Sequence, residues 1–555
     1  MKTLYSIILL FITISFFSCK KAYLDEKPLD FLSSSNAMVT YADFNLSIND
    51  MYRVVRTEFF TRDENYPFDY LYSTDLVFDG QANTYRHTNL AATFAPSGGR
   101  EIPLTHWSAL YKLIAEANTV ITRAPASAMS DSEKTLIVAK ARFFRALGYR
   151  SLAYLFGGVP LVLEEITTPK TDFVRASKAA VLNQCIEDLK YAVINLKAIT
   201  AVVDGEINQL AAGHLLAEVY LANGEFQNAA DAASAVISNG AATLMKNRFG
   251  SRSTVTTGNV YWDLFQPGNQ NRKSGNTEGL WVIQIETDIP GGGAVSTGQD
   301  GSYLLERHHA PYVGLLLSGG RNPFIWPADD YTGGRGIGWA ISTPHFSDEI
   351  WQSDFNNDIR NANINFVRSF TASNPASPLF GQAITTKSPP AGITAPTRGF
   401  YAYQSKSTTP GAHPANLIAN SANGLLRSTA GGTYLDQYMF RLAETYLIRA
   451  EAYLGLNNQS SAAADLNTIR ARSNASAVIA GYINIDYILD ERMRELGVEE
   501  KRMLTLTRLG LVYDRVRRFN TYYNDITPTY NLWPIPANEI ERNKDAKLTQ
   551  NPGYN

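Results

Sequence analysis

One amphipathic stretch, residues 441–473, restricts the fold of this chain more than any other feature. It reads RLAETYLIRAEAYLGLNNQSSAAADLNTIRARS. Between 443 and 454, small and aromatic residues recur at i, i+3, i+4 and i+7, a spacing that places them on one face of a helix. The pattern breaks at 455–459, and a second helical pattern follows at 462–469. The stretch therefore predicts a helical hairpin.

The hairpin has a second copy earlier in the chain, at residues 217–237, which reads AEVYLANGEFQNAADAASAVI. Six positions are identical in the two copies: Ala217, Glu218, Tyr220, Leu221, Ala229 and Ala230 match Ala450, Glu451, Tyr453, Leu454, Ala462 and Ala463. Repeated hairpins of this kind are typical of tetratricopeptide-like units. One unit cannot bury its apolar face alone, so neighbours must stack on it. The sequence therefore predicts a mainly α protein with a tetratricopeptide-like helical-hairpin scaffold, in which the repeated glutamates have packing roles.

Between the two copies, residues 239–432 have a different character. Helical periodicity disappears, and Gly, Pro, Ser, Thr and Asn interrupt short stretches such as LWVIQIE at 280–286, whose aromatic and β-branched content suits a strand. Five of the seven tryptophans lie in this region. Loops held on a rigid scaffold often carry binding residues. We therefore expect a large loop-rich insertion with a few short strands that binds the ligand.

The charge balance and the missing motifs exclude several function classes. The formal net charge is −2, and the basic residues form no stripe, which argues against nucleic acid as a partner. The sequence contains no HEXXH, G-x-S-x-G or P-loop motif. Asp354, Asn356 and Asp358 resemble the start of a calcium loop, but Ile359 stands where that loop needs glycine. We therefore expect a protein that is not an enzyme and has no cofactor or bound metal.

Three further features have structural interpretations. The charged run at 491–502 is typical of a solvated or ion-paired helix face. His214 aligns with Leu447 of the second hairpin, which predicts a hydrogen-bonded core histidine and not a metal ligand. Cys185 lies in an apparent helix and is expected to be an inert buried thiol.

The N-terminus has the features of an export signal. Lys2 supplies a positive charge, residues 4–17 form an apolar run, and Ser18 precedes Cys19. This order predicts a bacterial lipoprotein signal that is cleaved before Cys19, whose acylation would then hold the protein on a membrane. An ordinary secretory signal with an incidental cysteine is the alternative.

Several blocks, spread over the chain in a fixed order, resemble the SusD/RagB family of surface glycan-binding lipoproteins. They are WSALYKLIAEANTVI (107–121), AKARFFRALGYRSLAYLFGGVPL (139–161), RLAETYLIRAEAYLG (441–455), ERMRELGVEEKR (491–502), LWPIPANEIERN (532–543) and QNPGY (550–554). The resemblance implies a lipoprotein of the cell outer membrane that faces the exterior and captures an oligosaccharide without breaking a bond. It also implies a SusC-like TonB-dependent transporter as partner. The chain departs from the family after ERMREL, where it reads GVEEKRMLTLTRLG.

The candidate ligand-binding residues lie in two places. Sugar rings stack on flat aromatic faces, and polar side chains bind their hydroxyl groups. The glycine-rich stretch at 326–346 combines both kinds of residue, and the resemblance implies that an early loop also contributes. The candidates are Trp326, Tyr331, Arg335 and Trp339 in the insertion and Asp75, Arg86 and Phe94 in the early loop. In the alternative interpretation, these aromatic residues pack the insertion onto the scaffold.

Other functions remain open beside glycan capture. A protein of the same architecture could bind peptides or another nutrient, or could be a helical-repeat assembly scaffold. A glycoside hydrolase is a further alternative, although Asp329 and Asp330 are adjacent, and adjacency does not give the separation that such an enzyme needs. The predicted organisation is a signal peptide (1–18), a lipidated tether (19–35), an N-terminal helical scaffold (36–238), the loop-rich ligand-binding region (239–432) and a C-terminal helical scaffold (433–555).

Overall fold

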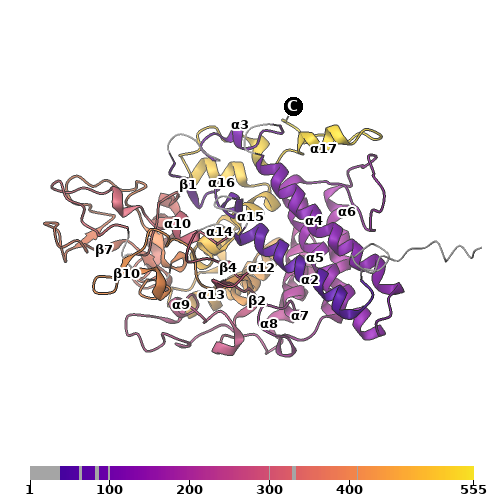
Figure 1. Ribbon diagram of the computed structural model, residues 1–555, viewed down its shortest axis with the longest axis horizontal. Helices are drawn as coiled ribbons and strands as arrows, with labels where there is room; N and C mark the ends of the chain where they lie inside the picture. Colours follow the sequence, from indigo (N-terminus) through magenta and orange to yellow (C-terminus); the bar gives the residue numbers. More distant parts are fainter. Residues whose placement is uncertain are drawn as a thin grey trace, which may run out of the picture.

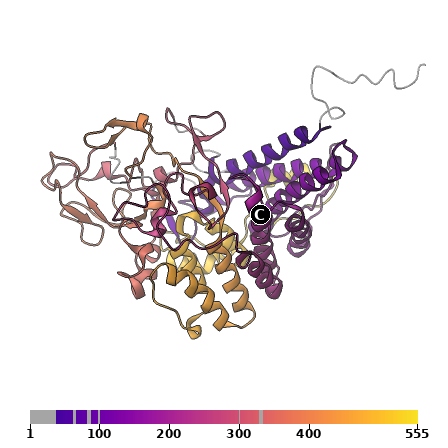
Figure 2. The same ribbon diagram turned by 90° about the horizontal axis from the view of Figure 1, so that it is seen from below.

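The computed structural model describes residues 38–61, 66–81, 87–97, 101–298, 301–327, 333–408 and 410–554. The long N-terminal helices gather on one side of the molecule, and the irregular region with its short strands projects from the other (Figure 1). Helices of the C-terminal part lie between the two (Figure 2). The proposed signal peptide, tether and Cys19 lie outside the described residues.

Four long helices form the N-terminal side: α2 (Tyr41–Arg56), α4 (Ile102–Arg123), α5 (Asp131–Phe156) and α6 (Lys178–Asn195). A capping box starts α5, because Ser130 Oγ accepts from the backbone N–H of Glu133 and the Glu133 carboxylate accepts from that of Ser130. In the middle of α5, a Cβ atom on Gly148 would lie 2.9 Å from Ile114 of α4. The absence of a side chain at Gly148 thus lets the two helices pack closely.

The two predicted hairpins are α7 (Gln209–Ala222) with α8 (Phe226–Ile237) and α12 (Leu442–Gly455) with α13 (Gln459–Arg472). They pack on each other, since Ala229, Ala230 and Ala233 of α8 share a buried cluster with Ile448 and Ala452 of α12. Small side chains at this contact let the helices approach closely. The prediction of a mainly helical, tetratricopeptide-like scaffold with a loop-rich insertion is therefore confirmed.

The chain closes with four shorter helices, and the insertion holds three more. The closing helices are α14 (Ile485–Glu495), α15 (Arg502–Leu509), α16 (Val512–Phe519) and α17 (Ala537–Arg542). Those of the insertion are α9 (Val260–Asp263), α10 (Leu305–His309) and α11 (Pro344–Ser347). A further short helix, α3 (Leu90–Thr93), precedes α4.

The strands are short and pair two by two. The antiparallel pairs are β1 (Val77–Asp79) with β5 (Ala340–Ser342), β2 (Gly279–Ile283) with β12 (Gln437–Arg441), β6 (Phe366–Val367) with β9 (Tyr403–Gln404), β7 (Ser369–Thr371) with β8 (Ala383–Thr385) and β10 (Ile418–Asn420) with β11 (Leu425–Leu426). In addition, β3 (Glu286–Thr287) pairs in parallel with β4 (Gly293–Ala294). The stretch LWVIQIE supplies β2, and the β2–β12 pair attaches the insertion to the start of α12.

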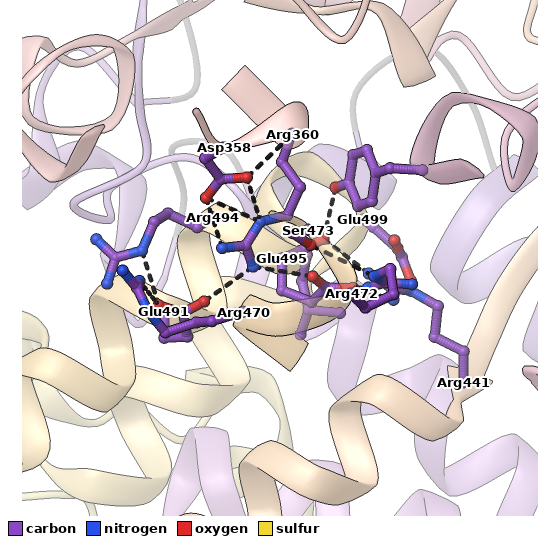
Figure 3. A network of polar contacts seen from close by, with 12 residues as sticks. Asp358, Arg360, Arg441, Arg470, Arg472, Ser473, Glu491, Arg494, Glu495 and Glu499 are labelled. Atoms are coloured by element: carbon purple, nitrogen blue, oxygen red, sulfur yellow. Dashed lines mark hydrogen bonds and ion pairs between the residues drawn. The ribbon is translucent and has the colours of Figure 1, made fainter. Parts of the chain in front are cut away.

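A buried carboxylate at the end of α14 joins the insertion to the second hairpin. Glu495 Oε1 accepts from Arg441 Nη1 at 2.6 Å and from Arg472, and its Oε2 accepts from Arg360 Nη1 at 3.0 Å (Figure 3). Arg441 ends β12, Arg472 lies in α13 and Arg360 belongs to the insertion. Burial disfavours the charged form of Glu495, but the arginines outweigh burial and hold its pKa well below the ordinary range. Glu495 thus links β12, α13 and the insertion through its carboxylate.

The charged run at 491–502 supplies further buried pairs. The Glu491 carboxylate pairs at 2.9 Å with each of three arginines: Arg360, Arg470 and Arg494. The run therefore forms an ion-paired face that is buried, and the alternative of a solvated face is wrong. The carboxylates of the calcium-like stretch belong to the same network, since Asp354 pairs with Arg470 and Asp358 with Arg360, both at 2.7 Å.

The repeated glutamates of the two hairpins have equivalent partners. Glu218 in α7 lies 3.4 Å from Arg150 of α5, and Glu451 in α12 accepts two hydrogen bonds of 2.7 Å from Arg508 of α15. In both copies the glutamate joins its hairpin to a neighbouring helix. These contacts confirm the packing role predicted from the repeat.

Two other predictions concern buried single residues. His214 is fully buried, and its Nδ1 lies 2.8 Å from Thr445 Oγ1, which confirms a hydrogen-bonded core histidine. Cys185 is also buried, and burial raises the pKa of its thiol, so that the reactive thiolate is disfavoured. Within the described part of the chain, no helix is both long and apolar enough to cross a membrane.

Candidate functional site

Asp75, one of the early-loop candidates, is a core residue. It is fully buried, and its carboxylate accepts hydrogen bonds of 2.7–2.8 Å from Arg502 and Arg515. Burial alone would raise the pKa of Asp75, but the two guanidinium groups hold it well below its ordinary range. With both oxygens engaged by arginines in the core, Asp75 has a structural role in place of the predicted ligand contact.

Phe94 is likewise part of the core. Its ring packs between Tyr530 and Trp533 of the closing segment, with centroid distances of 5.4 and 5.7 Å. The structure therefore contradicts a ligand contact by Phe94 as well. Arg86 and Tyr331, two further candidates, lie outside the described residues.

Trp326 has the geometry of a binding residue. Its side chain is 37% exposed, and the indole packs against the ring of Tyr312 with a centroid distance of 4.5 Å. A Cβ atom on Gly314 would lie 2.6 Å from the indole, so the glycine makes room for this position. The support holds the indole in place while part of it faces solvent, as stacking on a sugar ring requires.

One arginine, Arg398, connects Tyr312 to Trp339, and a second, Arg307, lies at Trp339. The guanidinium of Arg398 lies 5.2 Å from the Tyr312 ring centroid and 5.9 Å from that of Trp339, and the guanidinium of Arg307 lies 5.3 Å from that of Trp339. We name these four residues and Trp326 the aromatic ledge. Contacts from Trp326 to Tyr312, from Tyr312 to Arg398 and from Arg398 to Trp339 thus link two of the predicted site residues.

Arg335 lies beside the ledge and is partly buried. Its backbone N–H donates to Glu306 Oε1 at 3.0 Å, and its Nη1 lies 3.5 Å from the carbonyl of Ala430. The same Glu306 carboxylate is held at 2.7 Å by His413 Nε2. Glu306 thus holds the backbone at Arg335, one of the predicted site residues, in place.

The early loop reaches the ledge through β1 and not through Asp75 or Phe94. Asp79 of β1 pairs with Ala340 of β5, and the backbone N–H of Gly80 donates to the carbonyl of Trp339 at 2.7 Å. A Cβ atom on Gly80 would lie 2.5 Å from the carbonyl of Gly338, so a side chain would prevent this approach. An early-loop segment therefore lies against the ledge, although its residues are not the predicted ones.

The chemistry of the ledge suits binding better than bond cleavage. Its side chains offer flat apolar faces and cationic N–H donors. Glycoside hydrolysis needs two carboxyl groups on opposite sides of the scissile bond, and the five ledge residues supply none. Within the described residues there is also no group of three or more His, Cys, Asp or Glu side chains arranged to hold a metal ion.

Sequence reasoning missed Tyr312, Arg307 and Arg398. Tyr312 and Arg398 are joined by a hydrogen bond of 2.9 Å from the Tyr312 backbone N–H to the Arg398 carbonyl. No local pattern in the sequence connects two such distant loops. Tyr312 follows a buried histidine pair, and only its aromatic character could have suggested a role.

Comparisons with known proteins identify relatives over nearly the whole chain. The SusD family profile matches residues 323–554, and a second profile, described as "Starch-binding associating with outer membrane", matches residues 22–221. SusD-like protein P2 of Formosa agariphila is 26% identical over 548 residues, which cover 96% of each chain.

Solved structures share the fold at lower identity. A laminarin-binding SusD-like protein superposes with a TM-score of 0.67 at 22% identity, over 93% of this chain and all of that one. Surface glycan-binding protein A from Bacteroides fluxus gives a TM-score of 0.65 at 20% identity, with the same coverage of both chains.

Proposed function

Because this chain belongs to the SusD family, we propose that it captures a glycan on its aromatic ledge and passes it on without cleaving it. The observation that carries the proposal is the exposed indole of Trp326, which Tyr312 supports, with the guanidinium of Arg398 over the Tyr312 ring. Relatives whose names state a laminarin or surface-glycan ligand support this ligand class.

The proposal includes a location and a partner. We propose that acylated Cys19 anchors the protein to the outer membrane, facing the exterior, and that a SusC-like TonB-dependent transporter receives the glycan. The order of Ser18 and Cys19 after an apolar run and the description of the second family profile support the anchor. The family resemblance supports the transporter.

Replacing Trp326 by alanine is expected to weaken glycan binding about tenfold, which corresponds to the loss of a stacking contact worth about 1.4 kcal/mol. The melting temperature should stay within a degree or two, because the indole is already partly in solvent. Affinity electrophoresis through gels that contain different polysaccharides measures binding, and circular dichroism measures stability.

Tyr482→Ala is the matched control, because Tyr482 is 67% exposed and lies near α13, outside the insertion. Equal retention of both variants would remove the ledge from the proposal. If the wild-type protein is retained by no polysaccharide and binds peptide mixtures, the peptide-binding alternative replaces glycan capture. Reducing ends released by pure protein would instead establish a glycoside hydrolase.

The anchor has its own test. An inhibitor of the lipoprotein signal peptidase is expected to cause an uncleaved precursor to accumulate, because cleavage before Cys19 depends on that enzyme. Immunoblotting of cell fractions measures the size and the location of the protein. Normal processing in the presence of the inhibitor would contradict lipid anchoring and leave glycan binding untouched.

A further inference from the structure

The insertion contains a hollow that uses none of the ledge residues. It has a volume of about 1080 Å³ and lies between residues 252–262, 362–381 and 403–423. We name it the insertion cleft. Strand β7, which lines it, lies at the end of the molecule farthest from the N-terminal helices (Figure 1). Ligand pockets commonly measure about 300–1000 Å³, so the cleft can hold more than one sugar unit.

The cleft and the ledge share a short segment of chain. Ser373 lines the cleft, and its Oγ accepts from the backbone N–H of Ile325 at 3.1 Å. Phe370, also in the cleft, packs edge-on against Phe324 with a centroid distance of 6.2 Å. The segment that carries Trp326 therefore packs behind the residues that line one side of the cleft. The ledge and the cleft are neighbours, but they share no side chain.

Four aromatic residues line the cleft. Trp262, Phe370 and Tyr403 are almost fully buried, whereas Phe380 is 55% exposed. Phe380 lies in the turn between β7 and β8, where its backbone N–H donates to Ser377. Four aromatic side chains are exposed in the described part of the chain, and the two that belong to the insertion, Trp326 and Phe380, lie on the ledge and in the cleft. The ledge and the cleft thus each carry one exposed aromatic side chain.

The polar groups of the cleft are nearly all uncharged. Thr257, Thr371 and Asn423 are exposed residues of its lining. Of the described residues that line the cleft, one is charged, and this Arg252 is held by hydrogen bonds to Gln266 and Pro410 and lies 4.8 Å from the Trp262 ring centroid. The one cation that an anionic ligand could pair with is already engaged. A cationic ligand would meet no carboxylate among the described lining residues. Aromatic faces with neutral hydroxyl and amide groups suit an uncharged, polyhydroxylated ligand.

We infer that the insertion cleft is a second binding site, which takes a neutral oligosaccharide segment and stacks one of its rings on Phe380. The ligand class rests on the proposed function, but the site uses residues that the ledge does not. A glycan bound at two neighbouring sites dissociates more slowly than one bound at a single site, so the cleft would favour long chains over short ones.

The experiment uses isothermal titration calorimetry on the full chain with neutral hexasaccharides: maltohexaose, laminarihexaose, cellohexaose, mannohexaose and xylohexaose. For the sugar that binds, the wild type should show two sites. Phe380→Ala should weaken one of them about tenfold, and Trp326→Ala should weaken the other. Ala422→Trp, at an exposed lining position, should obstruct the cleft and weaken the Phe380-dependent site alone. Tyr482→Ala should leave both sites intact.

The outcomes separate the two proposals. One site that depends on Trp326 and responds neither to Phe380→Ala nor to Ala422→Trp would overturn the cleft and keep the ledge. One site that depends on Phe380 alone would support the cleft and remove the ledge. Absence of binding to every neutral sugar and polysaccharide would overturn both, and tighter binding of a peptide at the Phe380-dependent site would overturn its ligand class. Melting temperatures within a degree or two of the wild type show that each variant is folded.

Discussion

Replacing Glu495 by glutamine is expected to lower the free energy of unfolding by about 3–5 kcal/mol, the usual cost of leaving a buried charge without its partner. Glutamine keeps the shape of the side chain but removes the negative charge that faces Arg441, Arg472 and Arg360. These arginines would remain buried with less compensation. Urea unfolding followed by circular dichroism measures the loss.

The matched control is Glu187→Gln. Glu187 pairs with Lys190 on the surface of α6, and the two side chains are 64% and 52% exposed. Exposed pairs contribute little to stability, so this variant should unfold at the same urea concentration as the wild type. Equal midpoints for Glu495→Gln and Glu187→Gln would mean that the buried network does not hold the insertion on the scaffold.

Acid is expected to destabilise the protein in two stages. Burial lowers the pKa of His214 from 6.5 to about 3 and that of His309 from 6.5 to about 4. Between pH 6.5 and 4, the unfolded chain therefore binds protons that the folded one does not, and each histidine costs up to about 1.4 kcal/mol per pH unit. His106 does not offset this loss. Burial lowers its pKa, but Glu58 and Asp69 raise it above 6.5, so its stabilising effect is already complete at that pH.

The second stage comes from the buried carboxylates. Despite burial, nearby arginines lower the pKa of Glu491 from 4.5 to about 2, and those of Glu495 and Asp75 are also depressed. Their stabilising effect is complete above the unfolded pKa of about 4 and is lost as the pH falls towards 2. Glu116 opposes one of the two histidines, because burial raises its pKa from 4.5 to about 7 and the folded chain then binds a proton that the unfolded one does not. The melting temperature should therefore fall gently from pH 6.5 to 4.5 and more steeply below.

A histidine variant separates the stages. His309 Nδ1 lies 2.9 Å from the carbonyl of Ala340, and its Nε2 accepts from the backbone N–H of Gln404, an arrangement that fits neutral imidazole. His309→Gln should flatten the melting curve between pH 6.5 and 4.5 and leave the steeper part unchanged. A melting temperature that stays constant from pH 7 to 5 in the wild type would contradict the first stage.

The helical scaffold was predictable because its information is local. The alternation of small and aromatic residues in 441–473 and its repetition at 217–237 report helix faces within a few turns. The hairpins accordingly lie where the pattern indicated. The family resemblance rests on the same kind of local blocks, and both family profiles match the chain that contains them.

The site was predictable only in part, because its contacts join distant segments. In the sequence, Asp75 lies in a polar segment between two predicted helices and seemed free to contact a ligand. In the structure it pairs with Arg502, which lies 427 positions away. Trp326 and Trp339 could be selected from a glycine-rich stretch, whereas Tyr312 and Arg398 give no local signal of their contact. Local patterns in the sequence predict where the helices lie. Contacts between loops depend on residues far apart in the chain, so local patterns do not predict them.

The pairing of strands two by two makes the insertion suitable for loop grafting. Among the described strands, β7 and β8 pair with each other alone, and their turn carries Phe380. Exchange of the turn between these two strands with that of a relative is expected to leave the other strand pairs and the Glu495 network in place. A set of such chimaeras on one scaffold would provide sensors with different sugar preferences and similar thermal stability.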